Sequence, residues 1–228
     1  LIKFTKKGTF FMTKQEKANF IRKKLAKLYP NPTPPLNFTN PFTLLIAVLL
    51  SAQCTDERVN IVTKDLFKQA KTPKKMLSLG EKKVLEIIKS CGLAPKKSKA
   101  IIQTSKILIE RHQSKVPDNF TDLEKLPGVG HKTASVVLNQ AFGYPAFAVD
   151  THIHRLAQRW GLSKGKSVEQ TEKDLKSLFP KKDWGNLHLQ IIFYGREYCA
   201  AKDCYGLKCK ICKALYPKRR SKVITNKA

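Results

Sequence analysis

Two side chains in this sequence stand where they could carry out covalent chemistry. Lys132 follows a glycine-rich turn at 126–131 and opens a predicted helix. An amine near a helix N-terminus, in a chain rich in cations, is shifted toward its neutral, nucleophilic form. Asp150 precedes the next predicted helix, where a carboxylate commonly caps the first turn. A carboxylate facing the amine could instead accept protons and position water. Asp150 therefore has two interpretations, a catalytic carboxylate and a simple helix cap.

The turn before Lys132 has the pattern of a phosphate-binding hairpin. Gly128 and Gly130 are two positions apart, which lets the backbone turn tightly and approach the atoms of another chain. The helix that follows offers N–H groups and the positive end of its dipole to a phosphate. Gly-x-Gly alone would suit an ordinary turn between helices. The flanking helices and a net charge of +27 favour a helix–hairpin–helix contact with a DNA backbone.

Four of the six cysteines crowd into residues 199–212, namely Cys199, Cys204, Cys209 and Cys212. A secreted disulfide protein would spread its cysteines to close loops, so the crowding predicts a metal centre in a reducing cell. Four thiolates suit a tetrahedral zinc ion or a four-iron, four-sulfur cluster, and unligated thiols are the third interpretation. His152 and His154 are two apart and fall on different helix faces, which argues against a zinc site there.

Helix signals dominate the elements that must position these groups, and about ten helices with short connections predict an all-α protein. The nearly all-apolar segment at 41–50 predicts a helix buried at a domain centre. A stiff, proline-rich break at 30–35 suggests a domain crossing. Residues 1–11 are expected to be an N-terminal extension, and the residues after Cys212 a mobile basic tail. The expected helix boundaries are caps at Asn40, Thr121 and Asp183, a Ser167–Gln170 capping box, and a helix running to Cys91 and ending at Gly92.

The charge balance points to a polyanionic partner. Lys and Arg number 44 against 17 Asp and Glu. Such an excess attracts nucleic acid first and an anionic membrane surface second. The longest apolar run, Leu44–Leu50, is far shorter than the roughly 20 residues that span a bilayer, and we identify no secretory signal. We therefore expect a protein that is not secreted and has no membrane partner.

Three stretches together resemble the endonuclease III family of the helix–hairpin–helix glycosylase superfamily. They are 44–53, 126–134 and 148–155, and the resemblance extends from about Met12 to Cys212. It implies two helical domains with a DNA cleft between them. One is a six-helix barrel at about 34–144, which contains the hairpin. The other combines 12–33 with 145–228 and carries an iron–sulfur cluster.

The resemblance also implies an activity and assigns roles to residues. The activity is that of a bifunctional DNA glycosylase and AP lyase, which excises oxidised pyrimidines from duplex DNA and cleaves the strand by β-elimination. Lys132 matches the Schiff-base lysine and Asp150 the catalytic aspartate. Gln53 matches the residue that fills the hole left by an extruded nucleotide, and Leu93 the wedge against the opposite strand. The expected DNA contacts are Gln53, Leu93, Gly128, Val129, Gly130, His131 and His152.

The cysteine spacing departs from the family pattern. The family spaces its ligands C-x6-C-x2-C-x5-C, whereas this chain has C-x4-C-x4-C-x2-C. Cys199 stands where the first ligand belongs, and Cys209 and Cys212 resemble the close central pair. No cysteine follows Cys212, so Cys204 is expected to replace the last ligand of a [4Fe-4S] cluster.

Two alternatives are open besides the bifunctional enzyme. A monofunctional relative would keep the aspartate and the cluster but lack the lysine, and Lys132 argues against it. A non-catalytic module would bind duplexes with a steep salt dependence and tolerate loss of both Lys132 and Asp150. The remaining expectations are a monomer that binds double-stranded DNA with oxidised pyrimidines or abasic sites, in bacterial cytoplasm at the nucleoid.

Overall fold

The computed structural model describes residues 12–228 and is entirely helical over that range. It has twelve α-helices and one short 3₁₀ helix, and no strand occurs among the described residues. The predicted all-α class is therefore confirmed. The expected N-terminal extension at 1–11 lies outside the described residues.

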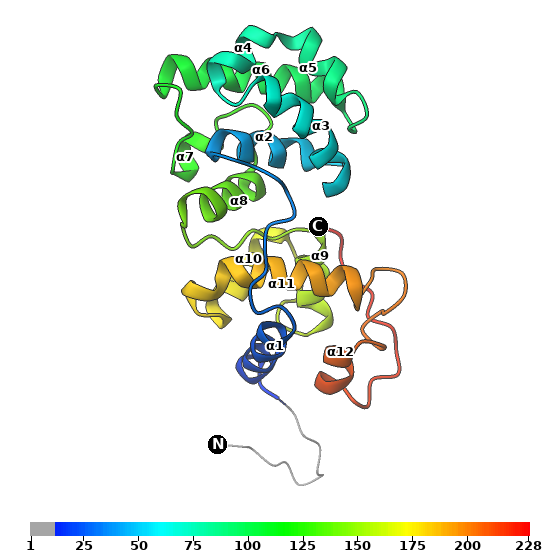
Figure 1. Ribbon diagram of the computed structural model, residues 1–228. Helices are drawn as coiled ribbons and strands as arrows, with labels where there is room; N and C mark the ends of the chain where they lie inside the picture. The colour runs from blue at the N-terminus through cyan, green and yellow to red at the C-terminus, as the bar shows by residue number, and fades with distance from the viewer. Residues whose placement is uncertain (1–11) are drawn as a thin grey trace. The chain divides into compact units, whose positions relative to one another are not determined.

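The chain divides into two compact units (Figure 1). Thr33–Ala148 forms one continuous unit. The described residues up to Pro32 and Val149–Ala228 form the other. The continuous unit is therefore a single segment inserted between the two segments of the discontinuous unit.

The continuous unit is organised around one buried helix. Nine consecutive residues of this helix, α2, from Phe42 to Leu50, are buried. α2 contacts α3, α6 and α8, so apolar side chains meet neighbours on nearly every side (Figure 1). The predicted buried central helix is confirmed. The helices of this unit are α2 (Pro41–Ser51), α3 (Asp56–Gln69), α4 (Pro73–Leu79), α5 (Glu81–Ile88), α6 (Ala94–Arg111), α7 (Phe120–Leu123) and α8 (His131–Phe142).

The discontinuous unit packs its first helix against its last long one. α11 contacts both α1 and α9. Trp160 and Tyr194 are almost fully buried there, with ring centroids 6.0 Å apart. The helices of this unit are α1 (Lys14–Leu28), α9 (Thr151–Arg159), α10 (Val168–Leu178), the 3₁₀ helix η1 (Lys181–Asp183), α11 (Trp184–Glu197) and α12 (Lys210–Leu215).

The predicted helix starts are partly confirmed. Asn40 caps α2 and forms a reciprocal capping box with Thr43. Ser167 caps α10 by accepting from the Gln170 N–H at 3.1 Å. Thr121 was the wrong cap, because Asn119 accepts from the Asp122 N–H at 2.9 Å and starts α7 two residues earlier.

Asp183 does not cap α11 as predicted. It makes no side-chain bond to the helix start, and its Oδ2 instead accepts from Arg22 Nη1 at 2.8 Å. The Asp183 carboxylate, which the local sequence pattern assigned to the helix cap, instead forms an ion pair with a residue of α1 that is distant in the sequence.

The residues after Cys212 contradict the expectation of a mobile tail. Tyr216 donates its hydroxyl to the Trp160 carbonyl at 3.2 Å, and Arg219 Nη1 donates to the Arg159 carbonyl at 3.0 Å. Further along, Asn226 Nδ2 donates to the Gly165 carbonyl at 2.7 Å. These bonds satisfy carbonyls at and beyond the end of α9, which helix geometry leaves without partners.

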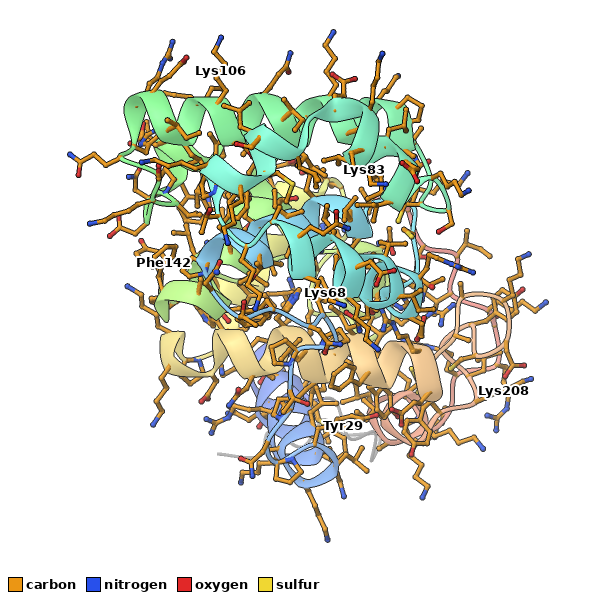
Figure 2. All side chains as sticks on the ribbon, turned by 45° about the horizontal axis from the view of Figure 1, so that its top comes forward. Tyr29, Lys68, Lys83, Lys106, Phe142 and Lys208 are labelled. Carbon is orange, nitrogen blue, oxygen red and sulfur yellow. The ribbon has the colours of Figure 1, made fainter. Side chains whose placement is uncertain are left out.

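Cationic side chains cover the outside of the helices. Figure 2 shows side chains tipped with nitrogen projecting from the ribbon, with Lys106 and Lys208 among those labelled. Both ammonium-bearing side chains are about two-thirds exposed, at 63% and 65%. Within the described range, no helix is both long and apolar enough to cross a membrane.

Candidate active site and metal centre

The hairpin before Lys132 is held by the core of its own unit. Gly128 has a φ of +77°, a conformation that side chains with a Cβ rarely adopt. A Cβ there would lie 3.4 Å from Leu49 of α2, so the turn packs closely on the buried helix. Thr104 of α6 donates its hydroxyl to the Pro127 carbonyl at 3.3 Å. Val129 is buried, whereas the two glycines are exposed.

The start of α8 suits an external anion. Gly130 is the N-cap, and having no side chain it makes no side-chain bond to the helix start. The first N–H groups of a helix need an acceptor from outside the helix, and a phosphate oxygen can supply it. His131 is the first residue of α8. Its Nδ1 lies 2.7 Å from Glu124 Oε1, and its ring stacks on Phe120 at 5.0 Å.

Lys132 is the second residue of this helix and is half-buried. Its amine therefore belongs to the first turn, where the dipole disfavours a positive charge. This is the position that sequence reasoning assigned to the nucleophile. The exposed hairpin glycines precede it directly, so a phosphate held there would bring the adjacent sugar into the region of the amine.

Asp150 belongs to the other unit and does cap its helix. Its Oδ1 accepts from the Ile153 N–H at 2.8 Å, and α9 begins one residue later. The capping interpretation of Asp150 is therefore correct. It uses one oxygen of the carboxylate, and a cap of this kind fixes the orientation of the group at a helix start. A catalytic role for the same group is compatible with this arrangement.

Gln53 and Leu93 lie in adjoining loops of the continuous unit. Both have left-handed backbone conformations, with φ of 52° and 59°, which is uncommon outside glycine. Leu93 is 46% exposed, so much of its apolar side chain is accessible at the surface. The loops touch at Gly92, where a Cβ would lie 2.5 Å from the Gln53 carbonyl oxygen.

This contact explains why the predicted end of the preceding helix was wrong. α5 ends at Ile88, and the residues up to Gly92 form a turn instead of a last helical turn. The close approach of Gly92 to the Gln53 loop and the left-handed Leu93 require the chain to leave the helix early.

The four clustered cysteines converge in the other unit. All four are buried, and their sulfur atoms lie within 4.8 Å of one another. Hydrogen bonds with the Cys199 and Cys212 thiols hold the pKa of Cys209 far below its usual range. The contact with Cys209 raises the pKa of Cys199, and the contacts with Cys199 and Cys209 raise the pKa of Cys212. Cys204, the expected substitute ligand, accepts from the Cys209 N–H at 3.4 Å.

The surroundings of the cysteines fit an anionic metal–thiolate group. Arg159 of α9 is only 2% exposed, and its Nη1 donates to the Cys199 sulfur at 3.3 Å and to the Cys199 carbonyl at 3.0 Å. A buried guanidinium requires compensating negative charge, which thiolates bound to a metal supply. Sulfur atoms that lie within 4.8 Å of one another are close to the roughly 3.8 Å spacing of a tetrahedral zinc site. A cubane cluster would hold the sulfur atoms further apart. The donor set therefore suits a bound metal.

Arg159 was not found by sequence reasoning. Its position four residues after Arg155 places both on one side of α9, and Arg155 Nη2 also donates to the Cys199 carbonyl, at 3.2 Å. Two arginines at this spacing, ahead of a cysteine-rich loop, are the signal that could have indicated it.

The two histidines of α9 have separate partners. His152 Nδ1 lies 3.2 Å from Arg155 Nη2, and His154 Nδ1 lies 2.9 Å from the Thr171 hydroxyl. His154 is buried, and burial lowers its pKa. His152 is half-buried at the first turn of the helix that Asp150 caps.

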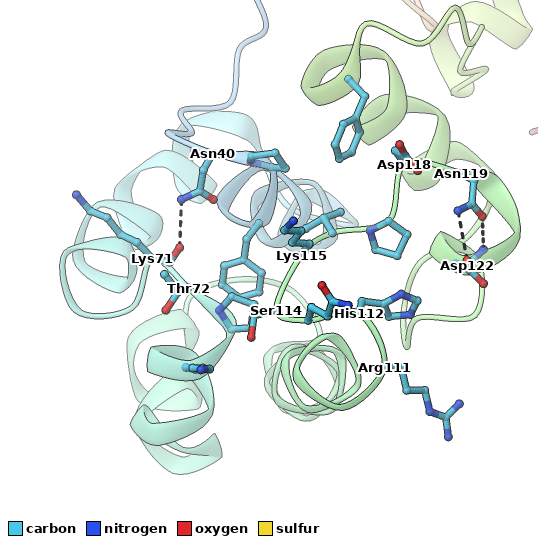
Figure 3. Close-up of a pocket in the computed structure, with 18 residues that line it drawn as sticks. Asn40, Lys71, Thr72, Arg111, His112, Ser114, Lys115, Asp118, Asn119 and Asp122 are labelled. Carbon is cyan, nitrogen blue, oxygen red and sulfur yellow. Dashed lines mark hydrogen bonds between the residues drawn. The ribbon is translucent and has the colours of Figure 1, made fainter.

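A hollow of about 940 Å³ in the continuous unit is lined by a different set of residues (Figure 3). Its polar side chains include Asn40, Thr72 and Asn119, each of which caps a helix. Asn40 also donates to the Lys71 carbonyl at 3.1 Å, and Arg111 points away from the hollow. Helix capping accounts for these groups, and none of the predicted site residues lines the space.

Comparison with known sequences identifies relatives over most of the chain. Residues 46–181 match the HhH-GPD superfamily of base excision DNA repair proteins. Endonuclease III of Rickettsia felis is 48% identical over 188 residues, covering 82% of this chain and 88% of the relative. Endonuclease III of Escherichia coli K12 is 49% identical over 179 residues, covering 78% and 85%.

Solved structures agree with the sequence relatives. A trapped covalent intermediate of an endonuclease III with DNA has a TM-score of 0.82 and 40% identity, covering 90% of this chain and 99% of that one. A thermostable thymine-DNA glycosylase, at 22% identity, shares the fold with a TM-score of 0.76. The identity and coverage of these matches show that the chain belongs to the HhH-GPD superfamily of base excision DNA repair proteins and, within it, to the endonuclease III family.

Proposed function

We propose that this chain is a bifunctional DNA glycosylase and AP lyase that removes oxidised pyrimidines from duplex DNA and cleaves the strand at the resulting site. The observation that carries the proposal is the placement of Lys132 in the first turn of α8, two residues after a hairpin whose glycines, Gly128 and Gly130, are exposed. A hairpin of this kind holds a phosphate, and an amine beside it can reach the attached sugar. The family membership supports the same activity.

The proposed reaction begins at the sugar carbon that carries the damaged base. The lone pair of Lys132 Nζ forms a bond to C1′ while the bond from C1′ to the base breaks, and the base leaves with that electron pair and takes up a proton. Asp150 accepts one of the two amine protons. The C1′–O4′ bond then breaks, O4′ takes its electron pair and the other amine proton, and an imine remains between Lys132 and C1′.

Strand cleavage follows from the imine. A proton leaves C2′, the electron pair forms a double bond between C2′ and C3′, and the 3′ phosphate departs. Water then hydrolyses the imine and releases Lys132. The hairpin holds the backbone in register throughout. Gln53 fills the hole left by the flipped nucleotide, which offsets part of the few kcal/mol that flipping costs, and Leu93 wedges against the opposite strand.

For the cysteines we propose a [4Fe-4S] cluster held by Cys199, Cys204, Cys209 and Cys212. Membership of the endonuclease III family supports the cluster over a zinc ion, and binding it would move the sulfur atoms further apart than the 4.8 Å within which they lie. When bound, it would serve as a structural crosslink that fixes the loop between Cys199 and α12. The buried Arg159 would then lie against an anionic group, and the basic residues of the loop would be held in place for phosphate contacts.

The cluster gives a direct prediction for metal content. Protein purified under anaerobic conditions should be brown and contain about four iron atoms per chain. Cys212→Ala should lose the iron and several kcal/mol of folding stability, because metal binding is part of the folding free energy. Cys54→Ala is the matched control, since Cys54 lies outside the cluster, and it should keep its iron. One zinc per chain without iron would contradict the proposal.

The enzymatic proposal is tested by trapping the imine. The protein is mixed with a duplex containing one thymine glycol, and borohydride is added to reduce any imine to a stable amine. We expect a covalent protein–DNA adduct with this duplex and with an abasic-site duplex, and none with undamaged DNA. Tight, salt-sensitive duplex binding with no adduct on either damaged duplex would contradict the proposal and favour a non-catalytic DNA-binding module.

A further inference from the structure

Two cysteines outside the metal centre lie in the adjoining loops of Gln53 and Leu93. Cys54 follows Gln53 and is half-buried, and Cys91 precedes Gly92 and is only 4% exposed. Cys54 packs against the apolar core that contains Cys91, and the residues next to them, Gln53 and Gly92, are in backbone contact. The two cysteines thus lie at the meeting point of two loops that are about 40 residues apart in the sequence.

The backbones of the two loops are also in contact. A Cβ at Gly92 would lie 2.5 Å from the Gln53 carbonyl oxygen, so only glycine allows this approach. Gln53 and Leu93 on either side are both left-handed. The two thiols therefore lie at the junction of two closely packed turns with uncommon backbone conformations. A small displacement of one turn must therefore shift the other.

A buried cation stands beside the sulfur atoms. Lys97 of α6 is 5% exposed, and its Nζ donates to the Leu50 carbonyl at 2.8 Å and to the Ala52 carbonyl. Burial, and then the proximity of Cys54, raise the pKa of Cys91 to about 11, and the charge of Lys97 opposes this rise. Cys91 thus remains protonated, while a nearby ammonium stabilises a thiolate formed in the pair.

We propose that Cys54 and Cys91 are a modification site, a dithiol that a low-molecular-weight disulfide oxidises to an intramolecular disulfide. The thiolate of Cys54, the more accessible of the two cysteines, attacks one sulfur of the small disulfide and expels a thiolate. Cys91, on losing its proton, attacks the Cys54 sulfur of the mixed disulfide and expels the second thiolate. One protein disulfide forms, the small disulfide is reduced to two thiols, and the two cysteine protons pass to them.

The disulfide would change the two DNA-facing residues, and this consequence rests on the proposed function. A disulfide fixes the two sulfur atoms about 2.05 Å apart, which draws the loops together. Gln53 is adjacent to Cys54, and Leu93 is two residues from Cys91. Because a displacement of about 1 Å can reduce a rate about a hundredfold, we expect oxidation to slow cleavage by about tenfold to a hundredfold.

The test uses the full chain with its metal centre loaded. The protein is incubated with oxidised glutathione, free thiols are alkylated, and the unreduced protein is digested with trypsin. Mass spectrometry should detect the peptides of Cys54 and Cys91 joined and lighter by two hydrogen atoms. Single-turnover cleavage of a thymine glycol duplex should be slowed and should recover with dithiothreitol. Cys54→Ala should be insensitive to oxidised glutathione, whereas Cys91→Ala should stop at the mixed disulfide between Cys54 and glutathione and give no joined peptides.

The outcomes separate this proposal from the preceding one. Joined peptides in a protein that never cleaves damaged DNA would leave the dithiol standing and contradict the enzymatic function. An active enzyme in which Cys54 and Cys91 are alkylated separately after oxidation would overturn the modification site. Joined peptides with an unchanged cleavage rate would overturn its effect on DNA processing.

Discussion

Lys132→Ala is expected to abolish the borohydride-trapped adduct and to lower strand cleavage at thymine glycol by about 10⁴-fold or more, the range seen when a covalent nucleophile is removed. The imine needs a primary amine, and alanine offers none. Alanine also favours helix, so α8 should still form. The measurement is single-turnover cleavage, with gel detection of the adduct and duplex binding measured in parallel.

The matched control is Lys106→Ala. Lys106 is 63% exposed on α6 and pairs with Glu110 at 3.7 Å, a surface ion pair that contributes little to stability. It removes the same charge without touching the hairpin, so its adduct yield and rate should be those of the unaltered protein. If Lys132→Ala formed adduct at an undiminished rate, another amine would be the nucleophile, and the assignment to Lys132 would be wrong.

Local sequence pattern predicted the helices well where the boundary depends only on nearby residues. Asn40, Pro41 and the apolar run that follows specify a capped, buried helix within a few residues, and α2 has that form. The pattern failed where a residue distant in the sequence determines the helix boundary. Arg22 pairs with the Asp183 carboxylate, which therefore does not cap α11, and the contact with the Gln53 loop ends α5 before Cys91. Neither contact is visible within a window of a dozen residues.

The candidate site residues also divide into those that the local sequence indicates and those that it does not. Residue type and spacing indicated the four cysteines, which the structure brings together, because crowded thiols have few other uses. The same reasoning predicts Lys132 as the nucleophile, and that role stays a prediction. Gln53 and Leu93 carry no such signature. Their left-handed conformations, and the exposure of Leu93, exist only once the two loops have packed together. Without the family resemblance, composition would have left both as loop residues.

Asp150→Asn is expected to lower base excision by about 10²-fold to 10⁴-fold while leaving the fold intact, and this variant separates the two roles of the residue. Asp150 caps α9 through Oδ1, and asparagine caps a helix about as well as aspartate. The loss of charge at the helix start should cost at most about 1 kcal/mol. An amide cannot accept a proton as a carboxylate does, so the whole catalytic contribution should be lost.

A second pair of variants makes the separation quantitative. Asp150→Ala should lose the same activity and, in addition, about 1 kcal/mol of unfolding free energy with the cap. Ser167→Ala removes the cap of α10 in the same unit, so it should show the stability loss without the rate loss. Thermal melts and single-turnover rates on one duplex distinguish the cases. If Asp150→Asn cleaved at the unaltered rate, capping would be the whole role of Asp150, and Lys132 would have to lose its proton to water or to another group.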